Sequence, residues 1–316
     1  MNLRVAIVGA GRMGRERARA SAALGATVSI VCDVARERAP ELAANHGAAA
    51  IARLSESDFR SVDAVFVCTP PSIRKQVILP AIAAGKPVFV EKPLALNMEQ
   101  AMYLIEALQQ RPVINAVGYM NRYRNSVAAA RREVQFSAPI GIVFHWFACR
   151  YSVPWWLHRE ESGGPVNEQC THYIDLCRYL IGEVAEVQAL GRHLPDVPAA
   201  EGAIAIGLRF KNGLIGSGFY SCEASQKQMG LELFFPNRSV QLSGWDLRLD
   251  ELSPEDVFVK ETAAFFRAVE TSDPSPILSD FASATSTQAV IDAICRATSS
   301  GSREPVISPR EVPVLV

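Results

Sequence analysis

With 316 residues, the chain is long enough for two domains of ordinary size, each with its own hydrophobic core. Its formal net charge of −1 gives no basic excess for nucleic acid or an anionic membrane, and no apolar run is long enough to span a bilayer. The first apolar run begins at residue 3, and the seven cysteines include no Cys-x-x-Cys pair. We therefore expect a soluble cytoplasmic protein with reduced cysteines and no secretory signal.

The first apolar run, residues 3–8, leads into Gly9-Ala10-Gly11-Arg12-Met13-Gly14 and then into an Ala- and Arg-rich stretch typical of a helix. In such a strand–turn–helix unit, the glycines let backbone N–H groups approach a pyrophosphate, and the helix N-terminus adds partial positive charge. A second strand ends in Asp33, about twenty residues past the glycine turn, where a carboxylate can accept hydrogen bonds from a ribose diol. The sequence therefore predicts a dinucleotide site made by residues 9–14 and Asp33.

Two further apolar strands end in segments that carry polar groups and prolines. Residues 63–68 end at Thr69-Pro70-Pro71, and residues 88–90 end at Glu91-Lys92-Pro93. Parallel sheets bind their ligands at the C-terminal ends of the strands, so we expect both segments to line the same crevice as the glycine loop. The alternation of strands and helices up to this point predicts an α/β Rossmann domain over residues 1–118.

After residue 118, runs of strands around few helices predict an α+β domain with a large, mainly antiparallel sheet over residues 119–316. The expected elements are helices over 125–136 and 166–181, a strand over 140–150, turns at 211–214 and 236–238, and closing helices over 254–271 and 280–299, joined by a loop over 272–279. We assign the closing helices to the second domain. Whether they pack against the Rossmann domain instead is an open alternative.

Three segments resemble the Gfo/Idh/MocA oxidoreductase family, named for glucose-fructose oxidoreductase and inositol dehydrogenase. They are residues 84–93, which contain Glu-Lys-Pro, Gly118-Tyr119-Met120-Asn121-Arg122-Tyr123, and Ser162-Gly163-Gly164 leading to His172 and Asp175. The resemblance implies a Rossmann domain followed by a domain whose sheet often mediates oligomerisation. It also implies hydride exchange between NAD(P) and, most commonly, a sugar or polyol.

Four residues depart from the family pattern. Ser162 replaces the first of three glycines, Cys170 replaces a glycine, and Arg74 replaces a frequent histidine after Thr-Pro. Glu168 stands where the family usually has aspartate. Because glutamate performs the same chemistry with a longer reach, activity is expected to survive, whereas the substrate is not assigned.

Three residues are the candidates for catalysis. Hydride transfer at an alcohol or ketone also requires a proton to move, and Lys92 at a strand end beside the crevice can supply the base or acid. On the second-domain helix, Glu168 and His172 lie four residues apart on one face, and histidine titrates near working pH. The alternatives are that Lys92 only binds a ribose or phosphate and that His172 is a structural residue satisfied by Asp175. No metal is expected, because nicotinamide supplies the redox chemistry.

Other polar and aromatic residues are candidates for binding. Asn121 and Arg122 follow the last Rossmann strand and are expected to contact the nicotinamide or the substrate. The aromatic group Tyr151, Trp155, Trp156 and His158 either walls a sugar-sized pocket or belongs to a core or subunit interface. Asp33 favours NAD because its charge repels a 2′-phosphate, whereas Arg36 and Arg38 leave NADP open.

We expect an NAD(P)-dependent dehydrogenase or reductase that acts on a sugar, polyol or related carbonyl compound. The alternatives are reduction of a C=C or C=N substrate, an NAD-assisted redox-neutral reaction, and a non-catalytic dinucleotide-sensing regulator. The presence of Lys92, Glu168 and His172 argues against the regulator. The apolar strands over residues 202–249 would leave a large patch on an uncovered sheet, so a homodimer or homotetramer is expected.

Overall fold

The computed structural model describes residues 3–35, 37–249 and 255–309. The chain divides into two compact units. Of the described residues, the first unit comprises 3–35, 37–95, 99–120 and 256–282, and the second comprises 96–98, 121–249, 255 and 283–309.

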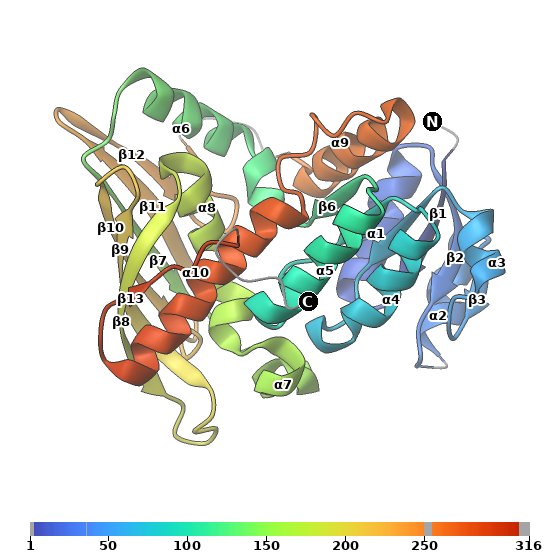
Figure 1. Ribbon diagram of the computed structural model, residues 1–316, viewed down its shortest axis with the longest axis horizontal. Helices are drawn as coiled ribbons and strands as arrows, with labels where there is room; N and C mark the ends of the chain where they lie inside the picture. The colour runs from blue at the N-terminus through green and yellow to red at the C-terminus, as the bar shows by residue number, and fades with distance from the viewer. Residues whose placement is uncertain (1–2, 36, 250–254, 310–316) are drawn as a thin grey trace. The chain divides into compact units, whose positions relative to one another are not determined.

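The first unit is built on a six-stranded parallel sheet (Figure 1). Its strands are β1 (Arg4–Val8), β2 (Thr27–Cys32), β3 (Ala49–Ile51), β4 (Ala64–Val67), β5 (Val88–Val90) and β6 (Asn115–Val117). They lie in the order β3-β2-β1-β4-β5-β6, and all described pairs are parallel. The central strands β1 and β4 are apolar and buried over residues 5–8 and 64–67, because both faces of the sheet are covered there. The predicted Rossmann fold is confirmed, with its switch point between β1 and β4.

The helices of this unit include one that comes from the far end of the chain. They are α1 (Arg12–Ala23), α2 (Arg38–Ala44), α3 (Glu56–Ser61), α4 (Pro71–Ala83), α5 (Met98–Gln110) and α9 (Val257–Thr271). On α9, Phe265 packs edge-on against Phe66 and Phe89, with ring centroids 5.5 and 5.6 Å apart. Such aromatic pairs stabilise beyond the area they bury, which explains why α9 packs against the parallel sheet.

The second unit is built on a seven-stranded sheet in the order β12-β11-β7-β10-β9-β8-β13. Its strands are β7 (Gly141–Phe147), β8 (Val184–His193), β9 (Glu201–Phe210), β10 (Ile215–Ser221), β11 (Gln228–Phe235), β12 (Arg238–Ser243) and β13 (Glu304–Pro305). Only β7 and β10 are parallel among the described pairs. The mainly antiparallel sheet is therefore confirmed, as is the turn between β9 and β10, where Asn212 Oδ1 accepts from the Leu214 N–H at 3.1 Å and Gly213 has φ +88°.

Helices cover one face of this sheet, whereas the other face carries exposed side chains. Ile142, Phe144 and Trp146 of β7 are buried with residues of α8 (Thr171–Ile181) and α10 (Phe281–Ser300), and α6 (Asn125–Phe136) packs its apolar side into the same core (Figure 1). The alternate residues of the strands point to the other face, as the two-residue period requires. That face carries exposed apolar side chains, including Val143, Leu190, Ile215 and Phe219.

The expected helix over residues 166–181 differs from one regular α-helix. It begins with the π-helical turn η3 (Val166–Cys170), and α8 follows at Thr171. The wider π-turn changes the spacing of side chains, and π-turns occur often at functional sites. The remaining short helices are η1 (Met120–Tyr123), η2 (Pro154–Leu157) and α7 (Arg159–Ser162).

Candidate active site

The glycine loop after β1 has the conformation that its glycines allow. Gly9 has φ +96°, and a Cβ on it would lie 2.7 Å from the backbone of Cys68 after β4. A Cβ on Gly14 would lie 1.8 Å from the Gly9 carbonyl oxygen, so neither glycine can be replaced without moving the backbone. By contrast, no described atom lies within 4 Å of a Cβ built on Gly11, where α1 begins. The loop is therefore packed on its inner side and open on its outer side, as a pyrophosphate site requires.

Asp33 connects the loops after β1 and β2. Its Oδ2 accepts from the Ala10 N–H and its Oδ1 from the Ala35 N–H, both at 2.8 Å. The side chain stays half-buried, and an ionised carboxylate has about four acceptor positions, so two hydrogen bonds leave room for a ribose diol. Arg38 is exposed at the start of α2, whereas Arg36 lies outside the described residues.

Glu91, Lys92 and Pro93 follow β5, and each has a different environment. The Lys92–Pro93 peptide bond is cis, and half-buried Lys92 lies between buried Glu91 and Pro93. Thr69 precedes Pro70 and Pro71 after β4, and its carbonyl oxygen accepts from Arg74 Nε at 2.9 Å. These segments lie at the C-terminal ends of β4 and β5, the same edge of the sheet as the glycine loop.

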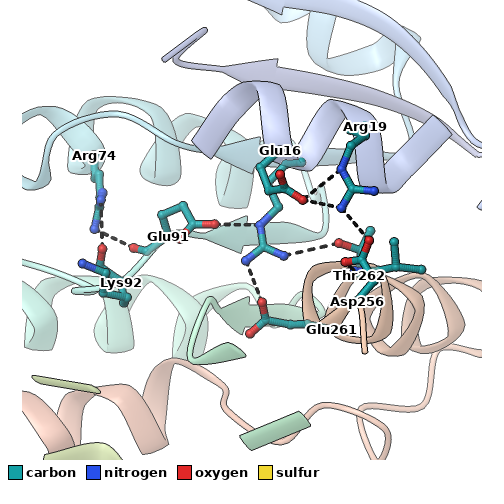
Figure 2. Close-up of polar contacts among 10 residues, drawn as sticks. Glu16, Arg19, Arg74, Glu91, Lys92, Asp256, Glu261 and Thr262 are labelled. Carbon is teal, nitrogen blue, oxygen red and sulfur yellow. Dashed lines mark hydrogen bonds and ion pairs between the residues drawn. The ribbon is translucent and has the colours of Figure 1, made fainter. Parts of the chain in front are cut away.

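A buried ion cluster holds the Glu91 side chain (Figure 2). Arg17 of α1 donates from Nε to Glu91 and from Nη2 to Glu261 of α9, both at 2.6 Å, and from Nη1 to Thr262 at 3.3 Å. Its guanidinium also lies 4.2 Å from the centroid of the Phe89 ring. Burial lowers the pKa of Arg17, but the charges of Glu91 and Glu261 outweigh it and leave the pKa raised, so Arg17 stays charged. The Glu91 carboxylate therefore ties its loop to α1 and α9.

In the second unit, His172 is stacked on a tryptophan. The imidazole of His172 on α8 and the indole of Trp146 on β7 are buried, with centroids 5.9 Å apart and an interplanar angle of 9°. Trp146 in turn contacts Tyr173 and Trp245 edge-on. Burial raises the pKa of the Tyr173 hydroxyl well above its usual range, so this phenol stays protonated. The stack fixes the plane of the His172 ring.

The turn that precedes His172 explains one departure from the family pattern. Ser162 is buried, and its Oγ accepts from the Gly164 N–H at 2.8 Å and donates to the His158 carbonyl at 3.1 Å. Gly163 and Gly164 have φ +79° and +93°, a region that favours glycine. Ser162 therefore stabilises the glycine turn from within. Glu168, in the π-turn that follows, is buried like His172.

Asp175 is engaged by an arginine. Arg122 donates from Nε and Nη2 to the two oxygens of Asp175 at 2.8 and 2.6 Å, and Thr287 of α10 donates to Oδ1 at 3.0 Å. Asn121 beside it accepts from Arg124 Nε at 2.9 Å. These buried contacts tie η1 to α8 and α10, which gives Asp175 and Arg122 a structural role in the second unit.

The four aromatic candidates do not share one environment. Trp156 is fully buried in the core of the second unit and packs on Tyr151, with centroids 5.3 Å apart. Trp155 and Tyr151 are partly buried against the same core, whereas His158 is largely exposed near Glu160. For Trp156, the core alternative is favoured.

Arg17 and Trp146 are not among the site residues predicted from the sequence. Arg17 lies 74 residues from Glu91 and 244 residues from Glu261, so no local spacing rule links them. Trp146 is one of several buried apolar residues of β7, and no motif marks it. A clue was available for Arg17, because an arginine on the sheet side of a helix requires a buried acidic partner.

Two features are absent from the part of the chain that the structure describes. No group of three or more His, Cys, Asp or Glu side chains is placed to hold a metal ion there. None of the described helices is both long and apolar enough to cross a membrane.

The parallel sheet and its glycine loop define a dinucleotide-binding fold, and comparison with known families identifies the family. Residues 3–119 match the family described as oxidoreductase family, NAD-binding Rossmann fold, and residues 139–241 match the GFO/IDH/MocA C-terminal domain. The chain belongs to the Gfo/Idh/MocA oxidoreductase family. The expected family and its NAD-binding Rossmann domain are thereby confirmed.

Individual relatives are similar over part of their length. The scyllo-inositol 2-dehydrogenase (NAD(+)) of Bacillus subtilis (strain 168) is 32% identical over 202 residues, which cover 61% of this chain and 58% of that protein. The levoglucosan dehydrogenase of Pseudarthrobacter phenanthrenivorans is 29% identical over 260 residues, covering 68% of this chain and 66% of that protein. The chain thus spans less than two thirds of the length of each of these two relatives.

A solved structure is similar over the whole chain. Levoglucosan dehydrogenase in complex with NADH and L-sorbose superposes with a TM-score of 0.88 at 19% sequence identity, covering 98% of this chain and 100% of that one. At this identity, the likeness establishes the fold.

Proposed function

We propose that the protein is an NAD-dependent oxidoreductase that transfers a hydride between the nicotinamide and a hydroxyl-bearing carbon of a sugar or polyol. The observation that carries the proposal is that Lys92 follows β5 at the same edge of the parallel sheet as the open glycine loop and Asp33. A proton-transferring amine therefore belongs to the same set of loops as the dinucleotide site. Family membership and the names of the inositol and levoglucosan dehydrogenases support a polyol substrate.

In this proposal, the chain's residues divide the work of binding and proton transfer. Bound NAD supplies the hydride acceptor, held by the N–H groups of the glycine loop and by Asp33. In the oxidative direction, the neutral amine of Lys92 accepts the hydroxyl proton as the C–H bond breaks, and the protonated amine returns it in the reverse direction. His172 of the second unit hydrogen-bonds a substrate hydroxyl, and Glu168 accepts from a neighbouring hydroxyl.

The reaction is tested by following nicotinamide absorbance with NAD and a panel of scyllo-inositol, myo-inositol, levoglucosan and other sugars and polyols. We expect NADH to form with at least one of them. If NADH binds but no member of the panel or its ketone changes the absorbance, the proposed reaction class is contradicted and the non-catalytic alternative gains support.

Cofactor choice is expected to depend on Asp33. We expect tighter binding of NADH than of NADPH, because the Asp33 carboxylate accepts from the ribose diol and repels a 2′-phosphate. The substitution Asp33→Asn removes the charge and keeps an oxygen for one backbone N–H. It should therefore weaken NADH binding and narrow the difference in affinity between NADH and NADPH. Fluorescence titration of both cofactors measures the effect. Tighter NADPH binding by the unaltered protein would contradict it.

We propose that the open face of the seven-stranded sheet is the subunit interface of a homodimer or homotetramer. Phe219 on β10 lies beside His145 of β7 and Ala205 of β9 on this face, with Val143 and Ile215 nearby. Several large apolar side chains exposed on one face of a sheet are costly to leave in water.

Light scattering at micromolar concentration should therefore give at least twice the mass of one chain. Phe219→Glu should shift the population toward monomer, because it places a charge in the interface. Phe136→Glu is the matched control, since Phe136 is 90% exposed on α6 and its replacement should leave the mass unchanged. A single-chain mass for the unaltered protein would rule the interface out.

We further propose a cytoplasmic location. All seven cysteines are free thiols, and four of them are buried. Burial raises the pKa of the Cys32 thiol to about 11, which makes it inert as a nucleophile. Free buried thiols suit a reducing compartment.

A further inference from the structure

Arg74 has an unusual set of hydrogen-bond acceptors. It lies in the first turn of α4 and is buried, and its guanidinium donates to main-chain carbonyls on both sides of Lys92. Nη1 donates to the Glu91 carbonyl at 2.5 Å and to that of Pro93, and Nη2 donates to the Lys92 carbonyl at 3.3 Å (Figure 2). With the Thr69 carbonyl, which accepts from Nε, four main-chain carbonyls surround the Arg74 guanidinium.

The side chain of Glu91 is held separately by Arg17. The segment is thus fixed twice, at its backbone by Arg74 and at the Glu91 carboxylate by Arg17. Lys92 lies in the sequence between these two anchored residues, and its own carbonyl accepts from Arg74.

We propose that Arg74 is a positioning residue for Lys92, a role that rests on the proposed function. Its planar fork of five N–H donors reaches several carbonyls at once, which a lysine or histidine side chain cannot match. A histidine side chain would supply at most two donors. Loss of the fork releases the backbone of residues 91–93, and misplacement of a reacting group by about 1 Å costs on the order of 100-fold in rate.

The test compares Arg74→Met and Arg74→Lys with Arg111→Met. Arg111 also donates to a carbonyl, that of Ala83 at the end of α4, and so controls for loss of a guanidinium–carbonyl contact in the same unit. With the most active polyol of the panel, R74M should lower kcat about 10- to 100-fold while KM and NADH affinity stay within about threefold. R74K should recover part of kcat, and R111M should match the unaltered enzyme.

A second readout needs no substrate. Labelling of the Lys92 amine by acetic anhydride, measured by peptide mass spectrometry relative to exposed Lys75, should change about threefold or more in R74M and less in R74K. Unaltered kcat in both variants, or Lys92 labelling equal to that of the unaltered protein, would overturn the proposal. If the unaltered protein turns over no polyol, the proposed function fails, and the labelling alone decides whether Arg74 places Lys92. If R74M does not fold, R74K carries both readouts.

Discussion

Replacing Lys92 by alanine is expected to lower kcat about 100- to 10,000-fold, while NADH affinity stays within a few-fold. The reason is that hydride transfer at a hydroxyl-bearing carbon requires a proton acceptor, and the amine of Lys92 is the candidate at the dinucleotide edge of the sheet. The matched control is Lys75→Ala, because Lys75 is exposed on α4 and packs over Tyr103, 4.4 Å from the ring centroid. Steady-state kinetics and fluorescence titration of NADH measure the two effects separately.

His172→Ala should lower kcat by a similar factor, because it removes the group proposed to hydrogen-bond a substrate hydroxyl. Its imidazole is stacked on Trp146, so Trp146→Leu should lower kcat by a smaller factor and leave NADH binding unaffected. Glu168→Gln should lower kcat/KM for the substrate more than it lowers NADH affinity. If Lys92→Ala and His172→Ala both retain nearly full turnover, the proton donor lies elsewhere, and Tyr151 and His158 are the next candidates.

Most of the architecture could be predicted because it follows from local patterns. The strands β1, β4 and β5 carry continuous apolar runs over residues 5–8, 64–67 and 88–90, the glycine loop requires positive φ at Gly9, and α6 occupies the expected residues 125–136. The π-turn over Val166–Cys170 could not be predicted, because no sequence period distinguishes it from the α-helix that follows. The return of α9 to the parallel sheet was left open because it depends on Phe265 contacting Phe66, 199 positions apart in the numbering, and not on any local pattern.

The candidate site divides in the same way. Gly9 to Gly14, Asp33 and Lys92 could be proposed as site residues because each follows a strand, and ligands bind at strand ends. The arginines that hold the Lys92 segment, Arg17 and Arg74, were not predicted as its supports, because their contacts join residues far apart in the sequence. Arg74 was noted only as a departure from the family's histidine, and its contacts with the carbonyls around Lys92 become visible only when α4 is placed beside the end of β5.

Arg17→Met is expected to lower the free energy of unfolding by about 3–5 kcal/mol, because it leaves Glu91 and Glu261 buried without their shared cation. The matched control is Arg19→Met on the same helix. Arg19 forms ion pairs with Glu16 and Asp256, but its side chain is 49% exposed, so its loss should cost less than about 1 kcal/mol (Figure 2). Urea denaturation of the two variants beside the unaltered protein gives the comparison.

The loss of stability in Arg17→Met should come from the buried carboxylates of Glu91 and Glu261, which lose their shared cation, and not from a loss of apolar contacts. Replacing the whole cluster, as Arg17→Met with Glu91→Leu and Glu261→Leu, should therefore recover much of the lost stability, since apolar groups of similar size can substitute for a complete buried ion cluster. The triple variant should nevertheless stay impaired in turnover, because the Glu91 side chain no longer anchors the segment that carries Lys92. A triple variant that is less stable than Arg17→Met would show that the cluster contributes net stability, and one with full turnover would show that Lys92 does not depend on this anchor.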